Sequence, residues 1–449
     1  MTFPDFLVGL MFVVVITIGL YSWKQPLYLV PLFVFLAGGL FGQVNLDEEI
    51  NLRITEGFTL VVRDFVVFLM LIHVFRARTR RKLTPAFRGP LVALLLALVA
   101  NLVLKVVLFS GEFDPKISQL LRFFVSTVVV YFLITEYLTE ENAMRFIHSC
   151  CLLAIVSVAV LIGYSIGLFP VPTESSSTHL FVGDESTAIR LGVPNSYFLL
   201  FPYFAVVAPL AQRSRRLDKW DIVTICSMVL GAFVALYRMY LFIVIIGLII
   251  ALVVHGKNII KRIAAGVALL FVMIVVVQLL SEANKSGIAG AVVERFAGLD
   301  QELKSEGSSA GGRIFRSFTV LGALSDPSTA LFGTVFTSRD QEMRQLIVGD
   351  LGILATWVYF GLAGLLFVIV IFKRGIALGL HSFRDAGIGG RVSGMLLLFL
   401  VSMLPSTLFM FDPLMHETTF VLWLAVLGTF DALHGMKGIT VLPEQNVNL

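Results

Sequence analysis

Positively charged side chains inside or beside apolar segments are the residues of this sequence whose chemistry stands out. Arg63 and Asp64 are adjacent near one end of an apolar segment, Lys105 lies near the end of the next, and Arg122 lies near the start of the one after it. More arginines follow in polar breaks: Arg190, Arg238, Arg313, Arg316, Arg339 and Arg344. A guanidinium binds a phosphate through two parallel hydrogen bonds, and a buried charge needs such a partner. If these cations converge, we expect them to bind a lipid phosphate or pyrophosphate.

Each of these cations also has a structural explanation. Arg63 could pair with Asp64 or with another helix, and Lys105 could extend its ammonium to the membrane interface. Arginines in the loops could be solvated. Arg238 is different, because a tight turn between two apolar segments has no structural need for a charge. We therefore expect Arg238 to contribute most to anion binding.

Acidic and histidine side chains near the same breaks are candidates for proton transfer. Partial desolvation would raise the pKa of a carboxylate toward the range of a general base. Asp350 is the first candidate, with Glu342, Asp340 and His416 behind it. Asp350 could instead be a helix N-terminal residue, where the macrodipole lowers the pKa of its carboxyl. His416 could be a solvated interfacial residue.

The composition excludes a soluble enzyme. Of 449 residues, 57% are hydrophobic and 14% are charged, and the mean hydropathy is +0.91, whereas soluble domains are about 25% charged. The 3 cysteines give neither a disulfide framework nor ligand spacing, so we expect no metal and no cofactor. No Walker loop, dinucleotide fingerprint or GxSxG motif is present, and a net charge of +4 indicates loops at a membrane rather than nucleic acid.

Apolar segments long enough to cross a bilayer recur along the whole chain, about thirteen of them. They lie near residues 5–23, 26–42, 58–75, 90–109, 118–138, 146–169, 195–212, 221–237, 239–254, 264–280, 349–372, 392–410 and 418–434. We expect the first span to be retained, because no cleavable signal peptide is evident. The sequence therefore predicts an all-α integral membrane protein, a single polytopic domain over 1–449 with about 12–14 transmembrane helices.

Basic residues in alternate loops predict the orientation of these spans. The basic loops are centred near 76–88, 213–219, 257–262 and 373–391, and the positive-inside rule makes them cytoplasmic. The N-terminus is then outside and the C-terminus inside. Two long outer loops remain, at 170–194 and 281–348, and the pieces 288–298 and 313–325 of the larger loop are expected to form short amphipathic helices at the membrane surface.

The order of several motifs resembles the superfamily of O-antigen polymerases and O-antigen ligases. Its parts are the segment 190–195 before a span, Arg238 opening an apolar helix, and a large outer loop with Gly312 and Arg313. Pro327 and Gly333 follow, and then a span with Gly361 and Gly364. The resemblance implies a polytopic inner-membrane glycosyltransferase that takes a glycan from undecaprenyl pyrophosphate at the periplasmic face, with arginines binding the pyrophosphate and no metal or nucleotide.

Ligases of this superfamily carry a histidine eleven residues before the first glycine of a Gly-x-x-Gly pair. Here that position is Asp350, followed by Leu351. We therefore expect a polymerase of O-antigen or another surface polysaccharide in lipopolysaccharide biosynthesis, acting in the bacterial inner membrane with the lipid-linked oligosaccharide as partner and possible help from a chain-length regulator. A ligase that transfers the glycan to lipid A core or protein is the alternative within the superfamily. A lipid or solute transporter using Arg63, Asp64 and Lys105 is the alternative of another class.

Overall fold

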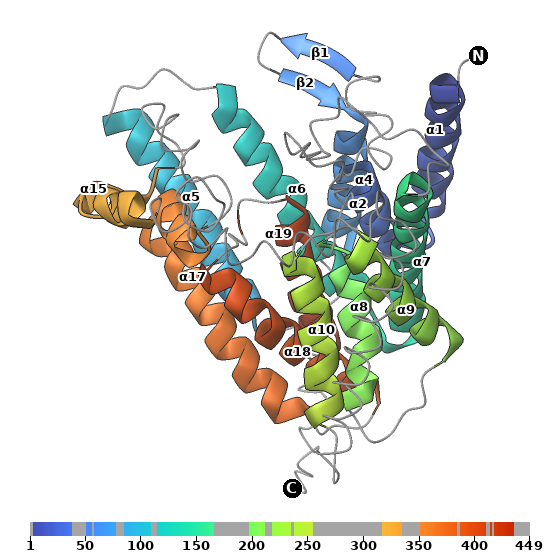
Figure 1. Cartoon of the computed structure of the whole chain (residues 1–449). Coiled ribbons are helices and arrows are strands. Elements are labelled where there is room, and N and C mark those ends of the chain that lie inside the picture. The colour runs from blue at the N-terminus through green and yellow to red at the C-terminus, as the bar shows by residue number, and fades with distance from the viewer. Residues whose placement is uncertain are drawn as a thin grey trace, which may run out of the picture.

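The computed structural model describes residues 3–37, 51–55, 58–77, 85–108, 115–165, 197–211, 218–234, 238–254, 317–334, 351–383, 387–409, 414 and 417–434. These parts of the chain are almost entirely helical (Figure 1). In chain order the elements are α1 (Phe3–Tyr21), η1 (Pro26–Tyr28), α2 (Leu29–Ala37), β1 (Asn51–Thr55), β2 (Phe58–Val61), α4 (Val62–Ala77), α5 (Arg88–Leu108), α6 (Pro115–Tyr137), α7 (Glu140–Ser165), α8 (Leu200–Val207), η3 (Ala208–Ala211), α9 (Lys219–Val234), α10 (Arg238–Val254), a short helix over 317–323, α15 (Pro327–Phe332), α17 (Ile353–Ser382), α18 (Ile388–Phe409) and α19 (Glu417–His434).

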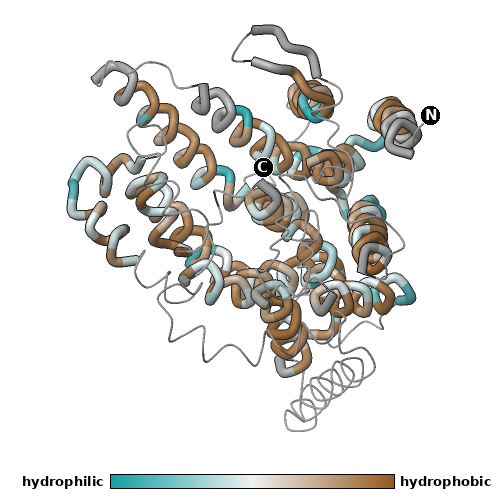
Figure 2. The backbone as a smooth tube through the Cα atoms, turned by 45° about the horizontal axis from the view of Figure 1, so that its top comes forward, coloured by the Kyte–Doolittle hydropathy of each residue, from teal (hydrophilic) through white to brown (hydrophobic). Residues whose placement is uncertain are grey.

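The apolar pattern located the helices well. The expected span at 264–280 lies outside the described residues, and each of the other expected spans contains a helix. Three stretches are long and apolar enough to cross a bilayer, namely Glu140–Gly163, Ile353–Ser382 and Ile388–Leu408, and six apolar helices in the described residues are shorter. Hydrophobic residues run along most helices in Figure 2. The protein is therefore a predominantly α-helical membrane protein.

The span expected at residues 58–75 begins before the helix that it contains, α4. Residues Phe58–Val61 form a strand that pairs antiparallel with Asn51–Thr55, so the all-α expectation needs this hairpin added. β-Branched and aromatic residues favour strands, and a short apolar run does not by itself distinguish a strand from a helix. Helix α4 begins only at Val62, so Arg63 and Asp64 lie in its first turn, whereas the sequence places them within the span.

The basic segment expected as a loop near 373–391 is largely helical. Helix α17 continues to Ser382, so Lys373 and Arg374 are exposed residues on the helix. Arg391 lies in the first turn of α18 and is 2% exposed, so it is not a solvated loop arginine.

Helix α19 is the centre of the bundle. Every residue from 419 to 433 is buried, and the helix packs against α6 and α18. A helix that is apolar on all sides belongs in a protein core. Trp423 makes edge-to-face contacts with Phe372 of α17 and Phe399 of α18, with ring centroids 5.4 and 5.5 Å apart. Three helices thus meet around one buried indole.

Figure 1 shows the hairpin and the start of α1 at one end of the bundle, which we call the upper end, and the last turns of α17 at the other, the lower end. At the lower end Asp431 of α19 is 1% exposed. Its carboxylate accepts hydrogen bonds from the backbone N–H groups of Ala86 (2.7 Å) and Phe87 (2.9 Å) and from the hydroxyl of Tyr131. Helix N-termini leave such N–H groups without intrahelical partners. Asp431 therefore caps the approach to α5 from more than 340 residues away in the chain.

A buried ion pair ties other helices at the lower end. Arg391 of α18 donates from Nη2 to Asp221 of α9 (3.1 Å) and from Nε to the carbonyl oxygen of Ala205 in α8 (2.7 Å). Asp221 also forms a reciprocal cap with Asp218, in which each backbone N–H donates to the other carboxylate. The charge of Arg391 is therefore paired and hydrogen-bonded inside the protein.

Candidate functional site

The expected site residues divide between described and undescribed parts of the chain. Arg63, Arg122 and Arg238 lie on described helices. The others fall outside the described residues: Asp350, Arg190, Arg313, Arg316, Arg339, Arg344 and His416, together with Asp340 and Glu342.

Arg122 of α6 and Asp64 of α4 form an ion pair at the upper end. Arg122 Nε donates to Asp64 Oδ1 at 2.6 Å, and Nη2 donates to Oδ2, so the contact is bidentate. The Asp64 carboxylate also accepts from the backbone N–H of Val61 at 3.0 Å, where the hairpin enters α4. The two side chains keep 27% and 19% of their surface exposed. This planar pairing is also the geometry with which arginine binds phosphate.

An aromatic cluster lies directly beside Arg122. Phe123 stacks with Phe420 of α19 at 6.2 Å between ring centroids, and Phe124 contacts Phe420 at 5.7 Å and Phe360 of α17 at 5.6 Å. Phe124, Phe360 and Phe420 are buried. The cluster fixes the position of α6 against α17 and α19, and through α6 it fixes the base of the Arg122 side chain.

Arg238 is the first residue of α10. The N-terminus of a helix carries a partial positive charge, so a cation there is unfavourable by about 0.3–1 kcal/mol at an exposed position. Beyond Arg238, Tyr240 is 2% exposed and Phe242 is 42% exposed. The charge of Arg238 is therefore unfavourable for the α10 macrodipole, and the surroundings of its side chain lie outside the described residues.

Helix α17 is interrupted at Gly361, near its N-terminal end. Gly361 has φ 65° and ψ −159°, a conformation accessible essentially only to glycine. Gly333, which ends α15, has φ 71° and ψ −177° and packs against the interruption. A Cβ on Gly333 would lie 2.2 Å from the Tyr359 carbonyl oxygen, and a Cβ on Gly361 would lie 2.3 Å from that of Leu331. Neither position has room for a side chain.

Hydrogen bonds complete this joint between α15 and α17. The N–H of Thr334 donates to the Val358 carbonyl oxygen at 2.8 Å, which satisfies an acceptor at the interruption. The Trp357 indole donates to the Ala330 carbonyl oxygen at 2.9 Å, and the Asn101 amide of α5 donates to that of Phe332 at 3.0 Å. Irregular backbone at membrane depth requires such partners. We call the contact of Gly333 with Gly361 the glycine joint.

The segment after Asp350 is also fixed. Leu351 is 3% exposed, and Gly352, with φ 55°, packs against the backbone of Thr407 and Leu408 near the end of α18. A Cβ on Gly352 would lie 2.5 Å from the Thr407 carbonyl oxygen. The chain therefore leaves the undescribed stretch that contains Asp350 at a defined point beside α18.

Asp326 caps α15 on the loop side of the glycine joint. Its carboxylate accepts from the backbone N–H groups of Ser328 and Thr329 and from both of their hydroxyls. Hydrogen bonds from Ser328 and then Thr329 hold the pKa of Asp326 below its ordinary value. The carboxylate is fully committed to the cap, so its role is structural.

The sequence analysis did not identify the paired roles of Asp221, Arg391 and Asp431. The signal was present, because each charge lies inside or at the edge of an apolar span, where it needs a partner. The partners themselves come from other helices and follow only from the tertiary structure. Among the described residues, no group of three or more metal-ligating side chains comes together.

Comparison with known proteins assigns no family to this chain. It matches no protein-family model, and no curated protein matches it significantly. Function must therefore be argued from the residues and their geometry.

Proposed function

We propose that this protein is a bacterial inner-membrane glycosyltransferase that polymerises lipid-linked glycan repeat units in surface polysaccharide (O-antigen) biosynthesis. The donor is a growing glycan on undecaprenyl pyrophosphate, and the acceptor is the non-reducing sugar of another lipid-linked unit. The upper end of the bundle faces the periplasm in this proposal. Support comes from the order of motifs in the sequence and from the cations at the upper end.

The position of Arg238 carries the proposal. A guanidinium at the start of α10 opposes the helix macrodipole, and binding a pyrophosphate offsets that cost. Arg122 is a second proposed contact, but its guanidinium already donates to both oxygens of Asp64, so a phosphate has to displace or share that carboxylate. Arg63, Arg190, Arg313, Arg316, Arg339, Arg344 and His416 remain proposed contacts to pyrophosphate or glycan.

The proposed reaction needs little beyond charge stabilisation. The acceptor hydroxyl oxygen attacks the anomeric carbon of the donor sugar, and the bond from that carbon to the pyrophosphate oxygen breaks. The electron pair leaves with the pyrophosphate, where arginines stabilise the developing charge. The hydroxyl proton passes to Asp350, the proposed base, at the entrance to α17.

One feature favours a second candidate, a lipid or solute transporter. Interrupted helices commonly mark the binding sites of transporters, and α17 is interrupted at Gly361. Asp64 is less suited to a coupling site, because both of its oxygens are engaged by Arg122 in the first turn of α4. A ligase remains the other glycan-transferring candidate, distinguished by its acceptor.

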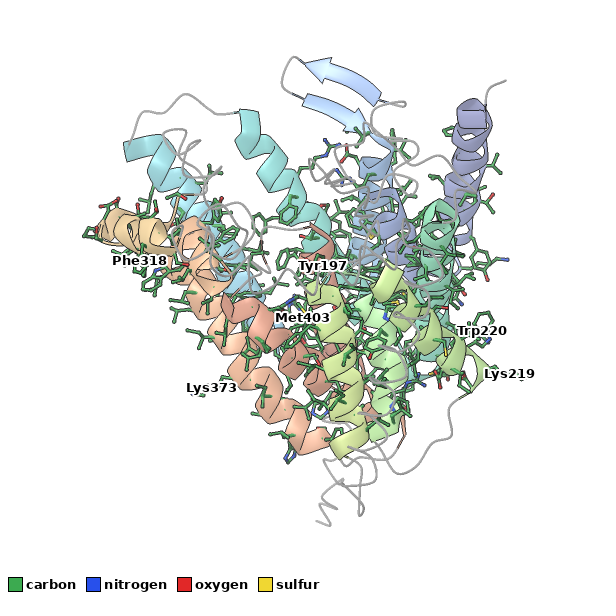
Figure 3. All side chains as sticks on the ribbon, in the orientation of Figure 1. Tyr197, Lys219, Trp220, Phe318, Lys373 and Met403 are labelled. Atoms are coloured by element: carbon green, nitrogen blue, oxygen red, sulfur yellow. The ribbon has the colours of Figure 1, made fainter. Side chains whose placement is uncertain are left out.

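The test is reconstitution of purified protein in liposomes with the organism's lipid-linked repeat unit, without nucleotide or metal. We expect a ladder of longer lipid-linked glycans that Arg238→Ala abolishes. Lys373→Ala is the matched control, because Lys373 is an exposed cation far along α17 from its interruption (Figure 3), and it should leave the ladder intact. No ladder from folded protein would overturn the polymerase. Transfer to added lipid A core would then indicate a ligase, and vesicle uptake without covalent product a transporter.

A further inference from the structure

The helix over 317–323 and α15 form a short helical pair with an exposed apolar side. Phe318 is 69% exposed, Leu321 48% and Leu331 52%, and no residue in the described part of the chain covers them. Phe318 and Leu321 are three residues apart and share one face of their helix. Figure 3 places Phe318 beside α15 at the edge of the bundle. Such a surface is unfavourable in water.

The opposite side of the pair is fixed to the protein. Val320 is fully buried, and Leu324 packs against the core. The carbonyl oxygens of Ala330 and Phe332 accept the hydrogen bonds from Trp357 and Asn101. The exposed apolar side chains therefore belong to a well-anchored element that presents them outward.

The exposed polar residues of the pair are gathered at the turn between its helices. Ser325, Asp326 and Ser328 are exposed there, and Asp326 is the single charged residue from 317 to 334. The pair thus has a polar turn and apolar flanks, which is the distribution expected of an element lying at a membrane–water interface.

We propose that this helical pair is an interfacial anchor that inserts Phe318, Leu321 and Leu331 into the acyl chains of the leaflet at the upper end. The occupant is bilayer lipid, because the apolar side continues the exposed apolar surface of the neighbouring membrane helices. Val103 and Leu104 of α5 and Leu362 and Leu366 of α17 are exposed. The hydrogen bonds from Asn101 and Trp357 place α15 against these two helices.

The glycine joint connects the anchor to the interior of the protein. Gly333 and Gly361 are in backbone contact, so the anchor is joined directly to the interruption in α17. This inference does not depend on the proposed enzymatic activity, since it concerns lipid contact alone.

Nitroxide accessibility in vesicles tests the anchor. Cys150 and Cys151 are fully buried, so Cys226→Ser gives a background in which a single introduced cysteine can be labelled. Labels are placed at Phe318→Cys, Leu321→Cys and Leu331→Cys in phosphatidylcholine–phosphatidylglycerol vesicles. Ser325→Cys in the turn is the matched water-exposed control, and Leu366→Cys on α17 is the lipid-exposed one.

We expect the three anchor labels to collide often with oxygen and rarely with a soluble nickel chelate, as at Leu366, while Ser325 shows the reverse. Nickel access at Phe318 and Leu321 equal to that at Ser325 would overturn the proposal. Low access to both reagents would overturn it as well. Spin–spin broadening would then identify a second copy of the chain as the covering partner, and its absence another segment of the same chain.

Discussion

The paired charged residues at the two ends of the bundle differ in how deeply they are buried. At the lower end Asp221, Arg391 and Asp431 are at most 2% exposed, and their charged groups are held by partners from other helices. At the upper end the side chains of Arg122 and Asp64 keep 27% and 19% of their surface exposed. The difference indicates that the buried lower-end charges hold the fold, whereas the Arg122–Asp64 pair is partly open to its surroundings.

The largest expected effect is at the buried pair. Arg391→Met leaves Asp221 as an uncompensated buried charge, so we expect the free energy of unfolding to fall by about 3–5 kcal/mol. Thermal unfolding in detergent measures this. Adding Asp221→Leu should recover much of the loss, and Lys373→Met, an exposed residue on α17, should change little. A single Arg391→Met variant as stable as the native protein would contradict the structural role of the lower end.

The next largest loss of stability is expected for Gly361→Ala. The conformation of Gly361 costs a residue with a Cβ about 1–3 kcal/mol, and the Cβ would also overlap the Leu331 backbone. Gly333→Ala should cost a similar amount, and the double variant should cost less than the sum because both break one joint. Gly322→Ala is the control, since a Cβ there meets nothing within 4 Å. Additive losses in the double variant would show that the two glycines do not act as one unit.

Asp431→Ala should destabilise the protein by about 1–3 kcal/mol, because it leaves the buried N–H groups of Ala86 and Phe87 without their acceptor. Hydrogen–deuterium exchange should accelerate most at these two amides. Tyr131→Phe removes only the third hydrogen bond to the same carboxylate and should have the smaller effect. Unchanged exchange at Ala86 and Phe87 in Asp431→Ala would refute the long-range cap.

Breaking the upper-end pair should affect stability least among the ionic contacts. Arg122→Lys loses the bidentate geometry, but an exposed pair contributes only about 0–1 kcal/mol. The proposed function predicts a large loss of glycan polymerisation in the same variant. Measuring both in one preparation sharpens the comparison of the two ends. A loss of stability as large as that of Arg391→Met would make Arg122 a structural residue.

The smallest expected effect concerns Asp326. Because hydrogen bonds lower its pKa in the folded protein, its contribution to stability is present above the pKa of the unfolded chain and is lost as pH falls through the folded value. The protection factors of the Ser328 and Thr329 amides, measured relative to the intrinsic exchange rate at each pH, should therefore fall on acidification. Asp326→Ala should abolish that pH dependence, and persistence of the dependence would assign it to another group.

Hydropathy alone predicted the helical class and most helix positions, because an apolar run of about 20 residues has few alternatives in a membrane. It failed at Phe58–Val61, where a strand and a helix have the same apolar composition. The hydropathy pattern also placed Lys373 and Arg374 in a loop, because it does not distinguish charged residues near the end of a helix from charged residues in a loop.

The sequence predicted the residue types of the candidate site but not the contacts between them. Arg122 was identified as a cation at the start of a span, but its partner Asp64 is on another helix and 58 positions away in the chain. The same holds for Asp431, whose partners just before α5 and on α6 are adjacent to it only after the bundle packs. Gly361 was noted for its spacing, yet its contact with Gly333 depends on how α15 meets α17.

The most direct test of the account is to map where a lipid pyrophosphate binds. A photoactivatable undecaprenyl pyrophosphate–linked sugar is crosslinked to the reconstituted protein, and the modified peptides are identified by mass spectrometry. We predict adducts at the upper end, around Arg238 and Arg122, that excess unlabelled lipid pyrophosphate competes away. Specific adducts confined to the lower end, around Arg391 and Asp431, or no competed adducts at all, would contradict it.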